Sequence, residues 1–338
     1  MDYEIFELGD VRLRQGATLS DTKLAFKTYG ELNAGKSNAI VYPTWYSGQH
    51  YDNEWLIGEG MALDPARYFI IIPNMLGNGL SSSPSNTPAP HDRASFPRVT
   101  MYDNVRFQHR LVTERFGIER LELVTGWSMG AGQTYQWAVS FPDMVKRILP
   151  FCGSARTSRH NVVFLEGVKA ALTADAAYQG GRYDRQPDIG LRAMARVYAG
   201  WGFSQQFYRE KSYERDPLGY ASLEDFLVSF WEGLFLKRDA NNLLAMLWTW
   251  QNADIGGTPG FHSLEDALEK IRAPAIVMPA KQDLYFPPED NEWEVKHMHR
   301  AELRVIPGAW GHFAGGGLNP DDTRFIDDGL KELLGTEV

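Results

Sequence analysis

The fold of this chain is decided by the stretch Leu121-Glu-Leu-Val-Thr-Gly126-Trp127-Ser128-Met129-Gly130-Ala-Gly132. An apolar run ends in Gly-Trp-Ser-Met-Gly, and a helical pattern follows it. The G-x-S-x-G spacing is typical of a strand that turns sharply into a helix and presents a serine at the turn. Because such a turn crowds its neighbours, the residues two before and two after the serine must nearly lack side chains, and Gly126 and Gly130 meet that need. The stretch predicts Ser128 as a nucleophile, beside a helix N-terminus that stabilises negative charge.

Composition narrows the class of protein. With 338 residues, of which 43% are hydrophobic, the chain is long enough for a large core with an insertion or a second domain. Its net charge of −9 argues against a nucleic-acid surface or a basic membrane-binding face. No apolar run approaches the roughly 20 residues that a membrane helix needs, and the start of the chain lacks the pattern of a signal peptide. We expect a cytoplasmic protein with no nucleic-acid or membrane partner.

Cysteine and histidine usage gives no sign of a metal. The single cysteine, Cys152, excludes an internal disulfide, and its place directly after the apolar run 148–151 predicts a buried, unreactive thiol. His297 and His299 lie in a charged segment, which is typical of a solvated helix face. No group of histidines and cysteines has the spacing of zinc ligands. We therefore expect no metal and no cofactor.

Strand-like and helix-like segments alternate along the chain. This alternation predicts an α/β fold with a mostly parallel, doubly wound sheet. Two early strands are expected to form an antiparallel edge, and helices are expected over 54–63 and 101–116. The predicted strands are residues 3–6, 24–28, 39–42, 68–72, the run before Ser128, 145–151, 275–279 and 302–306.

The long interval between the strands near residues 151 and 275 is rich in aromatic residues and helix formers. Residues 191–198 and 223–236 have helical periodicity. We expect a core of residues 1–153 and 268–338, and a helical cap, residues 154–267, inserted over the C-terminal edge of the sheet. Most aromatic side chains of the cap are expected to pack its own interior, and the rest to line a pocket above Ser128.

A serine nucleophile needs a base that is oriented by an acid. In this topology the acid and then the histidine follow the serine, each in a loop just after a late strand. Asp283 follows the predicted strand 275–279, and His312 follows the predicted strand 302–306. The sequence therefore predicts the triad Ser128, Asp283 and His312.

The hydrogen-bond donors for a developing oxyanion are expected from two backbone segments. One donor is the N–H of Met129, directly after the serine, and the second follows the early strand 39–42. That loop reads Pro43-Thr44-Trp45-Tyr46-Ser47-Gly48 and contains no H-G-G-G run. Tyr46 is the favoured second donor, with Trp45 as the alternative.

Several longer motifs accompany these residues over most of the chain. With them the sequence resembles the homoserine O-acetyltransferases and their esterase relatives within the α/β-hydrolase superfamily. The resemblance implies the α/β-hydrolase fold, an acylated Ser128, Asp283 and His312 as acid and base, and Tyr46 at the oxyanion donor position. Its motifs are 29–33, 38–41, 64–69, 74–79, 96–100, the elbow 126–132, the acid loop 283–288 and the base loop Gly311-His312.

The departures from that family fall in the expected substrate pocket. The transferases carry an aspartate directly after the catalytic histidine to recognise the substrate amine, and this chain has Phe313. An ammonium facing phenylalanine loses an ion pair, which costs on the order of a few kcal/mol in a desolvated site. The family's cap arginine corresponds to Lys169, which offers no bidentate fork, and the elbow carries the bulky Trp127. These three positions point away from homoserine and towards a less polar ester.

The sequence thus predicts a serine hydrolase that cleaves a carboxylic ester of a small molecule through an acyl-Ser128 intermediate. One alternative is an O-acyltransferase that moves an acetyl group from acetyl-CoA, then a co-substrate, to a small alcohol such as homoserine. A second alternative is an inactive binding protein on the hydrolase scaffold. The resemblance also implies a homodimer through the cap.

Overall fold

The computed structural model describes residues 2–337, and its centre is one eight-stranded sheet. The strand order is β1-β2-β4-β3-β5-β6-β7-β8. The pairs β1–β2 and β2–β4 are antiparallel, and all later pairs are parallel. The strands are β1 Glu4–Arg12, β2 Thr18–Tyr29, β3 Ala39–Val41, β4 Phe69–Pro73, β5 Leu123–Trp127, β6 Ile148–Phe151, β7 Ala275–Val277 and β8 Ala301–Leu303.

Eleven α-helices surround this sheet within the described residues. Short π-helical segments extend two of the helical runs, 111–115 after α1 and 227–232 between α6 and α7. None of the helices in residues 2–337 is both long and apolar enough to cross a membrane. The helices are α1 Met101–Arg110, α2 Met129–Ser140, α3 Arg159–Thr173, α4 Asp188–Gly202, α5 Gln205–Arg209, α6 Leu223–Phe226, α7 Gly233–Leu236, α8 Ala240–Gln251, α9 Leu264–Glu269, α10 Pro288–Lys296 and α11 Pro320–Leu334.

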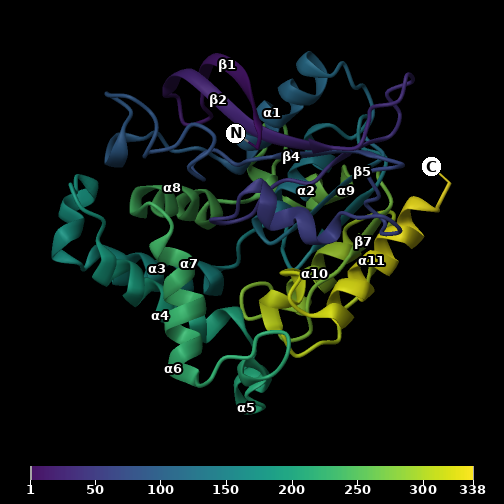
Figure 1. The fold of residues 1–338 in the computed structure, drawn as a ribbon. Helices are drawn as coiled ribbons and strands as arrows, with labels where there is room; N and C mark the ends of the chain where they lie inside the picture. The colour runs from purple at the N-terminus through teal and green to yellow at the C-terminus, as the bar shows by residue number, and fades with distance from the viewer. Residues whose placement is uncertain (1, 338) are drawn as a thin grey trace.

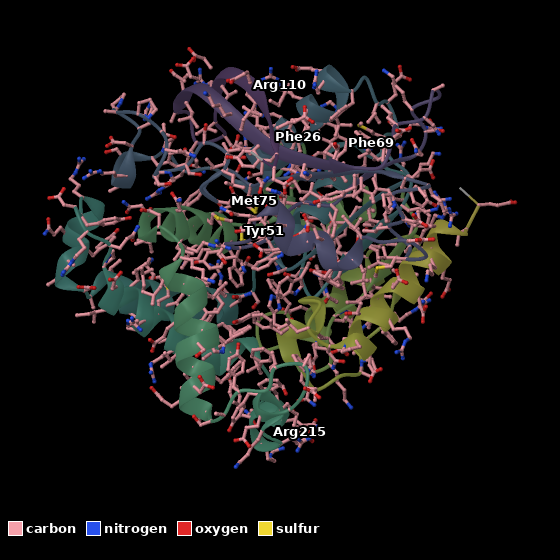
Figure 2. The ribbon with its side chains drawn as sticks, viewed as in Figure 1. Phe26, Tyr51, Phe69, Met75, Arg110 and Arg215 are labelled. Carbon is pink, nitrogen blue, oxygen red and sulfur yellow. The ribbon has the colours of Figure 1, made fainter. Side chains whose placement is uncertain are left out.

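The strands β3 to β7 are buried on both faces because helices cover each side of the sheet (Figure 1). Alternate residues of β4 serve different cores: Ile70 and Ile72 belong to one cluster, and Phe69 and Ile71 to the other. Phe26 and Phe69, labelled in Figure 2, both pack edge-on against Phe116 in the second cluster. The first cluster runs without a break into the cap, so the cap shares its core with one face of the sheet.

The cap holds helices α3 to α8, which gather to one side of the sheet in Figure 1. Its predicted end at residue 267 falls inside α9. Leu264 of that helix and Ile255 before it belong to the second cluster, the one that contains Phe69 and Ile71, and not to the cluster that extends into the cap. The last residues of the interval therefore belong to the core by packing.

Two local expectations differ from the structure. Residues 54–63 do not form an α-helix: a 3₁₀ helix, His50–Leu56, covers only the first of them, and the chain then turns irregularly, with Gly60 at a φ of 77°. The paired edge strands β1 and β2 are longer than the predicted 3–6 and 24–28. Their outer positions are polar and exposed, so the apolar pattern marks only part of each strand.

Candidate active site

Ser128 stands at the turn between β5 and α2 in a strained backbone conformation, with φ 57° and ψ −121°. The two glycines around the serine are required because neighbouring backbone atoms leave no room for a side chain. A Cβ on Gly126 would lie 2.5 Å from the carbonyl carbon of Gly130, and one on Gly130 would lie 2.8 Å from the carbonyl oxygen of Pro43. Any side chain at either position would therefore displace backbone and change the direction of the serine.

The side chains of Ser128, His312 and Asp283 form one hydrogen-bonded line. His312 Nε2 lies 2.9 Å from Ser128 Oγ, and His312 Nδ1 lies 2.7 Å from Asp283 Oδ2. The other carboxylate oxygen of Asp283 accepts the backbone N–H groups of Tyr285 at 2.8 Å and Phe286 at 3.1 Å. Since all three side chains are buried, the line is shielded from bulk water. The structure thus brings together the three residues that the sequence placed in separate loops.

Trp127 holds the histidine from the side of the elbow. Its Nε1 donates to the carbonyl oxygen of His312 at 3.1 Å, and its ring stacks on the imidazole with centroids 5.0 Å apart. On the other side the ring of Tyr285 meets the imidazole edge-on at 4.6 Å. These contacts fix the imidazole plane while leaving Nε2 directed at Ser128.

The backbone beside Ser128 offers free N–H donors. Among residues 2–337, no acceptor is bonded to the backbone N–H of Met129, Trp45 or Tyr46. One carbonyl group of the same loop is occupied, because Gln133 Nε2 donates to Thr44 O at 2.8 Å. Free donors on the wall of a buried site are what an oxyanion requires. The geometry does not choose between Trp45 and Tyr46.

A small cavity of about 30 Å³ lies over Ser128 and His312. Its walls are almost entirely aromatic or apolar, and much of the roof comes from the cap. Such a volume holds about one or two water molecules. The lining residues are Trp45, Tyr46, Ser47, Trp127, Ser128, Tyr198, Trp231, Leu234, Phe235, Trp250, Tyr285, His312 and Phe313.

Three tyrosines of this cavity remain neutral. Burial raises the pKa of Tyr46, Tyr198 and Tyr285 well above the usual value for a phenol. The rings of Tyr46 and Tyr198 lie parallel, with centroids 5.9 Å apart. These hydroxyl groups are therefore uncharged, and no lysine or arginine of residues 2–337 lines the cavity.

Of the three residues expected to form the substrate pocket, two line the cavity and one lies elsewhere. Trp127 and Phe313 are wall residues, and the Phe313 ring stacks on Phe203 with centroids 4.5 Å apart. Lys169 is not part of the wall: it lies on the half-exposed side of α3 and pairs with Glu166. The buried stripe of α3 runs through Phe164 and Val168, so the helix turns Lys169 away from Ser128.

Other chemistry-bearing groups lie apart from this cavity. Cys152 is fully buried, and burial raises the pKa of its thiol well above the usual range, in keeping with an unreactive thiol. A larger cavity of about 600 Å³, lined by Arg156, Arg159 and Asp254 among others, contains none of the three aligned side chains. Within the described part of the chain, no group of three or more His, Cys, Asp or Glu side chains is arranged to hold a metal.

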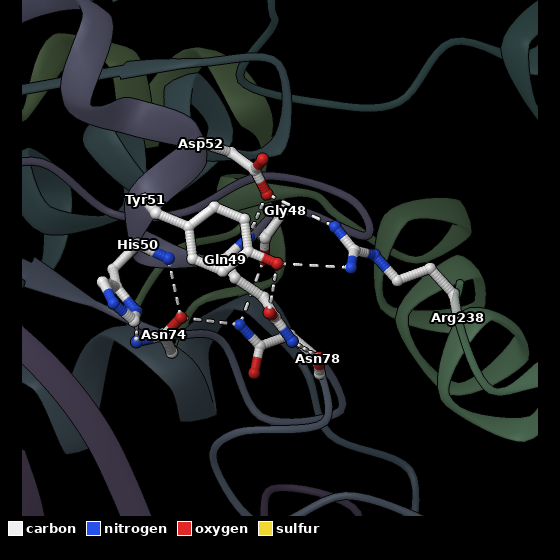
Figure 3. A network of polar contacts seen from close by, with 8 residues as sticks. All are labelled: Gly48, Gln49, His50, Tyr51, Asp52, Asn74, Asn78 and Arg238. Atoms are coloured by element: carbon white, nitrogen blue, oxygen red, sulfur yellow. Dashed lines mark hydrogen bonds and ion pairs between the residues drawn. The ribbon is translucent and has the colours of Figure 1, made fainter. Parts of the chain in front are cut away.

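Sequence reasoning missed the polar side chains that hold the loop after β3. Asn74 and Asn78, which follow β4, form hydrogen bonds to the backbone of this loop. Arg238 of the cap reaches the side chain of Asp52 in the same loop (Figure 3). In the sequence, the motif 74–79 indicates only the family resemblance, and its two asparagines are the one signal that points to these contacts. Arg238 carries no local pattern at all.

Comparison with known proteins places the chain in a family. Residues 48–315 match the model of the alpha/beta hydrolase fold family. The chain belongs to this family. The predicted α/β-hydrolase fold is therefore confirmed, with its mostly parallel sheet.

Relatives are named for two activities. An ethyl acetate hydrolase of Pseudomonas veronii is 41% identical, over 98% of this chain and 95% of the relative. The crystal structure of the acetyl esterase MekB superposes with a TM-score of 0.96 at 41% identity, covering 99% of this chain and 97% of that one. A homoserine O-acetyltransferase of Trichormus variabilis is 30% identical, over 89% of this chain and 86% of the relative. The predicted resemblance to the transferases and their esterase relatives is confirmed.

Proposed function

We propose that this protein hydrolyses carboxylic esters of small molecules through an acyl-Ser128 intermediate. The observation that carries the proposal is the buried line from Ser128 Oγ through His312, at 2.9 Å, to Asp283, at 2.7 Å. Each distance lies within the range for proton transfer along a hydrogen bond. The esterase names of the relatives at 41% identity support the same reaction class.

In acylation, His312 takes the proton of Ser128 as Oγ forms a bond to the ester carbonyl carbon. Asp283 keeps the imidazole in the Nδ1-protonated tautomer and stabilises the imidazolium. The N–H of Met129 and that of Tyr46, or of Trp45, donate to the oxyanion. The intermediate then collapses: the bond to the alcohol oxygen breaks, and His312 gives the proton to the leaving alcohol.

Deacylation repeats these steps with water. His312 takes one proton from the water molecule while the water oxygen forms a bond to the acyl carbon. The bond to Ser128 Oγ then breaks, the serine recovers its proton from His312, and the carboxylic acid is released. No cofactor enters either half of this reaction, because the three side chains and the backbone donors supply every proton transfer and charge contact it uses.

The size of the cavity favours a short acyl group. The free space between the aromatic side chains over Ser128 is narrow, about 30 Å³, which suits a short, apolar acyl group better than a long chain. The cap supplies Tyr198, Trp231 and Leu234 to this enclosure, so we assign the cap the role of a lid. Acetate esters of small alcohols are the substrates that this wall fits best.

Acetyl transfer to homoserine is the competing reaction, and the apolar lining of the cavity disfavours it. An ammonium group facing Phe313 would meet a phenyl ring that stacks on Phe203, and no carboxylate of the described residues lines the cavity to pair with it. A panel of p-nitrophenyl acetate, butyrate and octanoate, run beside acetyl-CoA with homoserine, separates the two reactions. Ser128→Ala is the blank. Hydrolysis of the acetate without an acceptor supports the proposal; turnover only with acetyl-CoA and homoserine contradicts it.

A catalytically idle binding protein is the remaining alternative. A fluorophosphonate reagent would label the wild type but not Ser128→Ala if the serine is activated as proposed. Absence of labelling in the folded wild type would favour the idle protein.

The cap also offers a surface for a homodimer. Val163 of α3 and Ile189 and Val197 of α4 are exposed by 66, 76 and 37% on adjoining helices. Association of two copies through this helix pair would remove these apolar side chains from water. We propose that two copies pair through this face. Light scattering should give twice the mass of the chain, and Ile189→Glu should give the single mass.

A further inference from the structure

The loop after β3, residues 43–52, forms one wall of the catalytic cavity and is held in a strained shape. Trp45, Tyr46 and Ser47 line the cavity, and Ser47 has a φ of 63°. A non-glycine residue in that region is retained only where surrounding contacts determine it. Because the proposed oxyanion donor Tyr46 precedes Ser47 directly, these contacts also fix the direction of its N–H.

Buried residues that follow β4 hold this loop by hydrogen bonds. Asn78 Nδ2 donates to Gly48 O at 3.0 Å and to Asn74 Oδ1 at 2.9 Å, and Asn74 Oδ1 also accepts the N–H of His50 at 3.0 Å. Gln49 Nε2 donates to the carbonyl oxygen of Asn78 at 3.0 Å. Both asparagines follow β4, so these contacts tie the loop to the sheet (Figure 3).

The cap packs Tyr198 and Trp250 against Tyr46 of this loop, and among the described residues its hydrogen bonds to the loop come from Arg238. Arg238 follows α7 and reaches Asp52 Oδ2 with Nη2 at 3.4 Å and Tyr51 OH with Nη1 at 3.5 Å. Both of these partners bond to Gln49: its N–H donates to Asp52 Oδ2 at 2.8 Å, and Tyr51 OH donates to its Oε1 at 2.6 Å. The contacts of the guanidinium therefore converge on one loop residue, three positions after Tyr46.

The same end of the cap also reaches the cavity. Leu234 and Phe235 of α7 line the space over Ser128, and Arg238 comes three residues after Phe235. The side chains of Arg238 and Asp52 are mostly buried, with 13 and 25% exposed, so solvent screens their attraction only in part. A change in the position of α7 therefore moves both the roof of the cavity and the contact to the loop.

We propose that Arg238 is a positioning residue that couples the cap to the oxyanion side of the site. Through Asp52 and Tyr51 it holds Gln49, and through the Trp45–Gly48 turn it holds the backbone N–H of Tyr46. The inference rests on the proposed ester hydrolysis, since an oxyanion forms only in that reaction.

Kinetics of Arg238→Ala, Arg238→Lys, Asp52→Asn and the Arg238→Ala/Asp52→Asn double variant test the coupling. Loss of one oxyanion donor lowers kcat by about 100- to 1000-fold, so misplacement of one donor should lower kcat for p-nitrophenyl acetate by about tenfold. KM should change by less than about twofold, because the contact acts on the transition state rather than on bound ester. Arg238→Lys should keep part of the kcat that Arg238→Ala loses. In the double variant, kcat should fall no further than in the more impaired of the two single variants. Lys237→Ala, which removes the same charge at an exposed neighbouring position, is the matched control.

Inhibition by trifluoroacetone reads the oxyanion contacts directly, because the ketone adds to the serine and carries an oxyanion when bound. Its Ki should rise in Arg238→Ala by the same factor by which kcat falls. A raised KM at constant kcat, an unchanged Ki, or additive losses in the double variant would overturn the coupling. If Arg238→Ala does not fold, the Arg238→Lys and Asp52→Asn data decide by the same criteria. A wild type that neither hydrolyses esters nor is labelled at Ser128 would instead remove the proposed function.

Discussion

Replacing Glu294 by glutamine should change how the stability of this protein depends on pH. Glu294 lies on α10 and is fully buried. Its carboxylate accepts hydrogen bonds from Ala155 N at 2.7 Å, Asn291 Nδ2 at 2.7 Å and Tyr135 OH at 2.9 Å. It thereby joins the helix after the nucleophile, the loop after β6 and the helix after the acid loop. Burial raises its pKa from 4.5 to about 7, against the effect of these hydrogen bonds.

The magnitude follows from that pKa. The folded state binds the proton of Glu294 more tightly than the unfolded state does, so its contribution to stability is fully present below pH 4.5 and is lost as the pH rises through 7. The shift is worth about 3 kcal/mol. Glutamine does not titrate. The difference in the free energy of unfolding, Glu294→Gln minus wild type, should therefore increase by about 2.5 kcal/mol between pH 5 and pH 8, which covers most of the shift.

Urea unfolding of both proteins at several pH values measures this difference, and other titrating groups cancel in it. The absolute stability of the variant also includes a constant term, because the glutamine amide cannot accept from all three donors. Glu289→Gln, at an exposed position on the same helix, is the control and should follow the wild type. A difference between Glu294→Gln and wild type that does not vary with pH would refute the reasoning.

Three further predictions concern the site itself. Asp283→Asn should lower kcat by about a thousandfold or more with little change in KM, because the amide favours the wrong tautomer of His312; a loss below tenfold in steady-state kinetics would contradict this role. Gly126→Ala should abolish fluorophosphonate labelling and lower Tm, since the new Cβ would lie 2.5 Å from Gly130; wild-type labelling rates would show that the elbow tolerates it. Leu234→Ala should raise the ratio of kcat/KM for butyrate over acetate by about tenfold, and an unchanged ratio would mean that the acyl group lies elsewhere.

The parts of the site that sequence reasoning located carry local signals. Ser128 has glycines at fixed spacing, and Asp283 and His312 each come directly after a late strand, so the topology of a parallel sheet brings the three to one edge. The structure places them within hydrogen-bond distance of one another. The α/β fold class was predictable for the same reason, because the alternation of strand-like and helix-like segments is also a local signal.

What escaped the sequence depends on contacts between distant segments. Arg238 and Asp52 are 186 positions apart, and Ala155 and Glu294 are 139 apart. Neither pair has a pattern that identifies its partner, because a single buried polar contact leaves no periodicity. Correspondence with a family position predicts Lys169 in the pocket, but the direction in which α3 turns its side chain is set by packing that one sequence does not show.

Mass spectrometry of the acylated enzyme tests the central claim most directly. Wild-type protein mixed with p-nitrophenyl acetate and quenched with acid during turnover should carry one acetyl group, on the peptide that contains Ser128. Ser128→Ala should carry none and should not turn over. Turnover without acetyl on Ser128, or acetyl on another residue that turns over at the catalytic rate, would contradict the acyl-Ser128 mechanism.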